Sequence, residues 1–166
     1  MTNSLEPAAR ACLQWTRSAV LNVMVAVGIG IAASGLFLAG RERGALDATS
    51  DLARILVRAD RLDLLVLIVV GYVVRRIGTR RPALSDPAHR ASRFSRAHVA
   101  TAMLGALAVP LGLLHGWAIR PQLEAVAPYW VAALALGFLS LPRAAELEGF
   151  DEPMPMPTPD PSEPRA

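Results

Sequence analysis

Apolar residues in this chain are gathered into blocks, and charged segments separate the blocks. The first block, residues 18–40, carries no charged side chain. A helix of about 20 apolar residues is long enough to cross the hydrocarbon of a bilayer. Further apolar segments at about 55–77, 98–119 and 124–142 predict three more spans. The pattern therefore predicts an all-α polytopic membrane protein with four transmembrane helices in a bundle.

The segments outside these blocks complete the predicted organisation. Residues 1–17 form a cytoplasmic N-terminal segment, 18–143 the four-helix transmembrane domain, and 144–166 an acidic tail. The tail contains the run PMPMPTPDPSEP, and alternating prolines oppose both helix and sheet, so we expect it to be disordered. A cleavable signal peptide is the alternative for the first block, although its apolar core exceeds the usual length of about 7–15 residues.

The stretch 97–119 has one face of small residues with a histidine at each end. At alternating spacings of three and four, the face consists of His98, Thr101, Gly105, Ala108, Gly112 and His115. Small residues let another helix backbone come close, and close packing is the main force between helices in lipid. We therefore expect this helix at the centre of the bundle, with Gly105, Ala108 and Gly112 at a helix contact.

Small residues also repeat at every fourth position of the first span. One row consists of Ala26, Gly30 and Ser34, and a second row beside it holds Gly28 and Ala32. This small-xxx-small pattern is typical of tight helix contacts in membranes. We expect Ala26, Gly30 and Ser34 to be packing positions.

The helix predicted from Asp51 to about Ile77 is unusual because its first half is charged. Ser50 is a favourable N-cap, and Asp51 suits the first turn. The apolar residues form one stripe, which we expect to face inward: Ile55, Ala59, Leu62, Val66, Val69 and Val73. An ionisable group within a membrane is costly and indicates a functional site. The candidate intramembrane or interfacial charges are Arg58, Asp60, Arg61 and Asp63.

Every basic residue of the chain is an arginine, which indicates a GC-rich bacterial codon bias. Seven of the 17 lie in one segment with a single acid, Asp86: Arg75, Arg76, Arg80, Arg81, Arg90, Arg93 and Arg96. The positive-inside rule places this segment and both termini in the cytoplasm, and hence the protein in a bacterial inner (cytoplasmic) membrane. Asp86-Pro87 predicts a helix start, followed by a surface helix that turns into the third span.

The arginine-rich segment predicts a partner. Near a membrane surface, each arginine attracts anionic lipid head groups by about 1 kcal/mol. Nucleic acid is the alternative, but the segment holds a single aromatic residue, Phe94, and is tethered between two spans. The predicted partner is therefore a lipid bilayer with anionic head groups, and no nucleic acid is expected. Tyr129, Trp130 and Trp117 are expected to form an aromatic belt at the opposite surface.

His98 and His115 are candidate haem ligands, because neutral imidazole commonly ligates haem iron. The form H-x6-G-x9-HGW resembles the haem-binding helices of b-type cytochromes and ferric reductases, over this one helix. The resemblance implies haem b and a redox function. Residues 17 apart in a helix stand about 25 Å apart, so both cannot ligate one haem. Haem would therefore require a homodimer, a partner subunit or a different axial ligand. The alternative is that both rings lie at the membrane edges.

The remaining chemistry is sparse. Cys12 is the single cysteine, which excludes an internal disulfide, a thiolate zinc site and an iron–sulfur cluster. The sequence contains no recognisable nucleophile–base pair, phosphate loop or Glu-x-x-His cluster, so no catalytic residue, metal ligand or resident cofactor is predicted. We expect a non-catalytic accessory or scaffold subunit that packs against another membrane protein, or against its own copy, through the small-residue faces of the first and third spans. Two alternatives stay open: a haem-b redox subunit, and a small transporter or channel component that uses Asp60, Arg61 and Asp63.

Overall fold

The computed structural model describes residues 7–42, 44–46, 50–79 and 87–147, and these residues form helices and connections without any strand. The helices are α1 (Pro7–Ala39), α2 (Asp51–Thr79), α3 (Pro87–Ala118), α4 (Leu123–Leu139) and a short 3-10 helix, η1 (Ala144–Leu147). The all-α prediction is confirmed. The tail beyond residue 147, expected to be disordered, lies outside the described residues.

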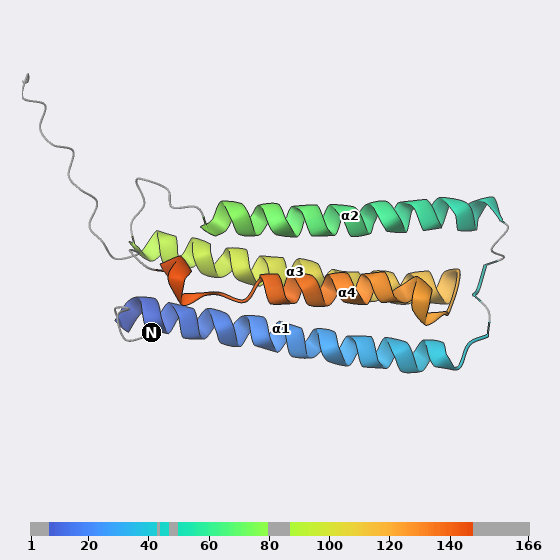
Figure 1. Ribbon diagram of the computed structural model, residues 1–166, viewed down its shortest axis with the longest axis horizontal. Coiled ribbons are helices and arrows are strands. Elements are labelled where there is room, and N and C mark those ends of the chain that lie inside the picture. Colours follow the sequence, from blue (N-terminus) through green and yellow to red (C-terminus); the bar gives the residue numbers. More distant parts are fainter. Residues whose placement is uncertain (1–6, 43, 47–49, 80–86, 148–166) are drawn as a thin grey trace, which may run out of the picture.

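Consecutive α-helices run antiparallel and form an elongated bundle (Figure 1). The bundle therefore has two ends: the Pro7 end, where α1 and α3 begin, and the Asp51 end, where α2 and α4 begin. The three most extensive helix interfaces all involve α3, and α1 and α2 lie on opposite sides of α3 and α4 (Figure 1). The predicted central position of this helix is confirmed.

Two helices start where local capping signals predict. The backbone N–H of Ala53 donates to Ser50 Oγ at 3.2 Å, so Ser50 caps α2. Helix α3 begins at Pro87, where a missing N–H costs nothing. The expected turn between a surface helix and the third span is wrong, because α3 runs unbroken to Ala118. The first turns of α3 pack against α1, where Phe94 contacts Leu13.

The apolar stripe of α2 faces outward, so its expected inward orientation is wrong. Ile55 and Leu62 are 63% and 62% exposed, and the stripe continues exposed through Val73. The buried positions of α2 are Ala53, Asp60 and Gly71. In lipid, no hydrophobic force draws large apolar side chains inward, and small residues that permit close approach determine the contact face.

Two helices are long and apolar enough to cross a membrane, α1 over Ala9–Ala39 and α3 over His89–Ala118. By length and composition alone, these two helices are compatible with membrane association. Helix α4 is apolar but shorter, and α2 carries charges in its first half. Length and hydropathy therefore support two spans directly, not four.

Candidate functional site

Among the described residues, the buried ionisable side chains lie in two clusters at opposite ends of the bundle. At the Asp51 end the cluster consists of Asp60 and His115, with Tyr129 beside them. At the Pro7 end His98 lies against Ser140 and Glu146. Between the two clusters the core is apolar, with Val27, Ala108, Val109, Ala132 and Ala133 at its centre.

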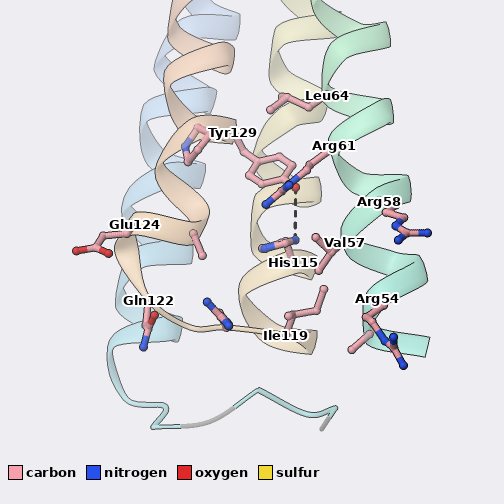
Figure 2. Close-up of a pocket in the computed structure, with 14 residues that line it drawn as sticks. Arg54, Val57, Arg58, Arg61, Leu64, His115, Ile119, Gln122, Glu124 and Tyr129 are labelled. Atoms are coloured by element: carbon pink, nitrogen blue, oxygen red, sulfur yellow. Dashed lines mark hydrogen bonds between the residues drawn. The ribbon is translucent and has the colours of Figure 1, made fainter. Parts of the chain in front are cut away.

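The first cluster joins three helices through His115 of α3. Its Nδ1 lies 2.9 Å from Asp60 Oδ2 on α2. The Tyr129 hydroxyl on α4 lies 3.4 Å from the same nitrogen (Figure 2). The shorter contact assigns the Nδ1 hydrogen to the carboxylate, so Nε2 is the ring nitrogen left for another partner. All three residues are less than 9% exposed, so the ring is held in one orientation.

A cavity of about 610 Å³ opens beside His115 and Tyr129. Its lining includes Arg54, Arg58, Arg61 and Arg120 from α2 and from the connection between α3 and α4. Arg61 points towards Tyr129 and His115, whereas Arg54 and Arg58 point away from them (Figure 2). The cavity therefore combines a fixed imidazole with arginine side chains at its wall and rim.

The structure separates the charged residues that the sequence places together on α2. Asp60 is buried against His115, while Arg58, Arg61 and Asp63 are exposed. Tyr129, expected in an aromatic belt, is 3% exposed and faces the bundle interior. His98 is fully buried and His115 is 8% exposed, so both rings lie inside the bundle. Each ring is enclosed by neighbouring helices near one end of α3.

The second cluster ties η1 to the bundle. His98 Nδ1 lies 2.7 Å from the carbonyl oxygen of Ser140, to which it donates. Its Nε2 lies 3.1 Å from Glu146 Oε2, and this contact is an ion pair only when the ring carries a charge; it lacks the alignment of a hydrogen bond. Arg75 donates from Nη2 to Glu146 Oε1 at 2.6 Å. Both nitrogens of His98 therefore face oxygen atoms of the chain, which does not fit a haem ligand.

The Glu146 carboxylate makes this cluster sensitive to pH. Burial raises the pKa of Glu146, but the contact with His98 and the charge of Arg75 outweigh burial, so its pKa lies below the usual 4.5. A carboxyl group with a lowered pKa in the folded state stabilises the fold above its unfolded pKa. This stability is lost as the pH falls through the folded value.

We expect Glu146→Gln to lower the thermal unfolding midpoint of the detergent-purified chain at about pH 7. The difference from the parent should shrink as the pH falls below 4.5 and through the lowered pKa of the folded carboxyl, because the parent Glu146 then becomes protonated as well. The measurement is the midpoint of both proteins across this pH range. Glu42→Gln, at an exposed position, is the control. Equal midpoints of parent and Glu146→Gln at pH 7 would contradict the assignment.

The predicted packing residues lie mostly inside the bundle. A Cβ on Gly105 would stand 2.9 Å from Leu136 Cβ, and one on Gly112 would stand 2.8 Å from Tyr129 Cβ. Ala108 is fully buried. In α1, a Cβ on Gly30 would stand 3.2 Å from Val109 Cγ1, and Ser34 is 4% exposed. Ala26, in contrast, is exposed and belongs to no such contact.

The arginines expected at lipid head groups have different environments. Arg76 and Arg96 are exposed. Arg75 is held by Glu146, and Arg93 donates to the carbonyl oxygen of Ile77 at 2.9 Å. Arg90 is half-buried, and Arg80 and Arg81 lie outside the described residues. Part of this basic segment therefore stabilises the Pro7 end instead of facing solvent alone.

An apolar groove of about 590 Å³ lies between α1 and α4 near the Asp51 end. Ala32 and Gly35 line it from α1, and Val126 and Trp130 line it from α4. The indole N–H of Trp130 is buried without a hydrogen-bond partner among the described residues.

Sequence reasoning did not identify Tyr129, Ser140 or Glu146 as site residues. A tyrosine or a glutamate at a helix end carries no pattern that points to a histidine many residues away. Within the described part of the chain, no group of three His, Cys, Asp or Glu side chains is arranged to hold a metal ion. Comparison with protein-family models, with curated proteins and with solved structures finds no match.

Proposed function

We propose that the protein is a four-span bacterial inner-membrane protein that serves as a non-catalytic accessory subunit of a larger membrane complex. Large apolar side chains exposed on all four helices support the four spans, for example Ile29, Leu62, Met103 and Val131. In lipid these side chains are solvated by acyl chains. The excess of arginines between α2 and α3 supports cytoplasmic termini, which reporter fusions after Gly78 and after Ala144 test.

The surface for a partner differs from the one that the sequence predicts. The small residues of α3, and Gly30 and Ser34 of α1, are used within the chain. The second small row of α1 remains open: Ala32 is exposed, and a Cβ on Gly28 would meet no atom within 4 Å. Ala32 lines the groove between α1 and α4. This open small row beside an apolar groove is the observation that carries the proposal.

We assign the groove to a transmembrane helix of another membrane protein. A helix packs closely where small residues let its backbone approach, and Gly28 and Ala32 stand one helical turn apart. The groove is apolar, and the ring of Trp130 lines it from α4.

The substitution Ala32→Leu tests this assignment. The tagged protein, solubilised from its own host in a mild detergent, should migrate on a native gel in a complex larger than one chain. We expect Ala32→Leu to remove that complex, because the added side chain fills the groove. Ala33→Leu is the matched control, since Ala33 is also exposed but does not line the groove.

A photo-reactive residue at position 32 then identifies the occupant. A cross-linked product of twice the chain mass indicates a second copy, and any other protein product indicates a different subunit. If both leucine variants keep the complex, or if the parent migrates as one chain, the accessory role through this groove is wrong.

One observation bears on each of the two alternative functions. The apolar core between the polar clusters offers no polar path along the bundle axis for a transported ion. For the haem alternative, His98 does not fit a ligand because both of its ring nitrogens face oxygen atoms of the chain. His115 is then the one candidate ligand left of the two. Neither alternative has an observation that favours it over the accessory role.

A further inference from the structure

We propose that the cavity beside His115 binds a phosphate group. This proposal does not depend on the partner groove. The first argument is charge, because four arginines and one glutamate line the cavity. Arg54 is paired with Asp51, and Arg58 points away from His115 (Figure 2). Arg61 and Arg120 therefore carry this argument. Arginine presents a planar fork of donors that matches phosphate oxygens. A cavity with this lining attracts a compact anion.

The start of α4 adds backbone donors to the same cavity. Gln122 is the N-cap of α4, and its side chain makes no capping hydrogen bond. Gln122, Glu124 and Ala125 line the cavity. The N–H of Ala125 donates to the carbonyl oxygen of Gln122 at 3.0 Å. The N–H groups of Leu123 and Glu124 and the positive end of the helix dipole are what this turn offers to a phosphate.

His115 supplies a third, fixed hydrogen-bonding group. Asp60 engages Nδ1 at 2.9 Å, and this contact orients the ring as a carboxylate orients a ligating histidine. The remaining nitrogen, Nε2, can pair with phosphate in either form of the ring, as an acceptor from a phosphate hydroxyl or as a donor to a phosphate oxygen. Because His115 is 8% exposed and packed beside Tyr129, little side-chain entropy is lost on binding.

The acidic groups near the cavity do not cancel this preference. Asp60 is engaged by His115 and does not line the cavity. Glu124 is exposed and points away from His115 (Figure 2). Arg61, in contrast, points towards Tyr129 and His115 (Figure 2), and so is placed to contact an anion there.

The cavity also has apolar wall residues, Val57, Leu64 and Ile119. A phosphate group could therefore arrive as a free ion or as the head group of an anionic lipid whose chains continue along the bundle. Both sources present the same phosphate oxygens to the arginines. The experiment separates them.

The test uses the full chain in detergent and two probes. Inorganic phosphate is titrated by calorimetry, and vesicles of phosphatidylglycerol in phosphatidylcholine are compared with pure phosphatidylcholine by native mass spectrometry of the extracted protein. We expect saturable phosphate binding or retained phosphatidylglycerol. Loss of one charge-assisted contact should weaken either by about tenfold in Arg61→Gln and in Arg120→Gln.

Arg41→Gln is the matched control. Arg41 lies at the same end of the bundle, over the rings of Phe37 and Trp117, and does not line the cavity. The Arg41→Gln substitution removes one positive charge, as the two cavity variants do, and should leave binding unchanged. Binding of phosphate identifies the free ion, and retention of phosphatidylglycerol without phosphate binding identifies the lipid. The proposal is overturned if neither probe binds, or if Arg41→Gln weakens binding as much as the cavity variants.

Discussion

Replacing Asp60 by alanine should lower the free energy of unfolding by about 2 kcal/mol. The change leaves the Nδ1 hydrogen of His115 buried, with only a distant contact of 3.4 Å to the Tyr129 hydroxyl. Hydrogen bonds in membrane bundles average only about 0.6 kcal/mol in double-mutant cycles. Here we expect the larger value of about 2 kcal/mol, because truncation leaves a buried donor without an acceptor and removes the carboxyl partner of the ring.

Asp63→Ala is the control for this prediction. Asp63 lies on the same helix, three residues further on, and is exposed. An exposed substitution away from such contacts changes stability by about 0.5 kcal/mol at most. Reversible unfolding of the detergent-purified variants in denaturing detergent measures both values. Equal effects of the two substitutions would show that the contact between Asp60 and His115 does not stabilise the bundle.

Replacing Gly105 or Gly112 by leucine should destabilise the bundle by at least about 2 kcal/mol, since overpacking of a close contact costs about 1–3 kcal/mol. At Gly105 the added Cβ alone would stand 3.1 Å from the backbone oxygen of Ala133. Backbone atoms of α4 cannot move aside as a flexible side chain can. The remaining atoms of leucine then require α3 and α4 to separate.

Gly28→Leu, in contrast, should not destabilise the isolated chain. No atom lies within 4 Å of a Cβ at Gly28, so no contact opposes the change. Leucine also forms helices better than glycine, by somewhat less than about 1 kcal/mol. We therefore expect unchanged or higher stability of the isolated chain. The unfolding assay used for Asp60 measures all three variants, and a Gly105→Leu protein as stable as Gly28→Leu would contradict the close packing of α3 on α4.

Local signals in the sequence were sufficient for much of the fold. The serine at position 50 and the Asp86-Pro87 pair locate the starts of α2 and α3, because capping depends on neighbours within one turn. The small-residue face from His98 to His115 identifies the central helix, because small residues let a neighbouring backbone come close. Helix α3 contacts all three other α-helices.

The arrangement of the polar site could not be obtained in the same way. The sequence singled out Asp60 and His115 separately, and it treated Asp63 as equivalent to Asp60. The two residues that pair are 55 positions apart, and their meeting depends on how α2 is rotated about its own axis. Tyr129 and Glu146 became site residues only when α4 and η1 were placed against α3.

By itself, therefore, the sequence determined the helices, two of their starting points and the residues on which tight packing depends, because these follow from periodicity and capping within a few residues. Tertiary structure alone decided which face of each helix is inside. For α2, periodicity shows the apolar stripe, but whether that stripe turns inward depends on the surroundings. In water the stripe would be buried, whereas in lipid close approach of small residues decides the contact, and Ala53, Asp60 and Gly71 face the bundle instead.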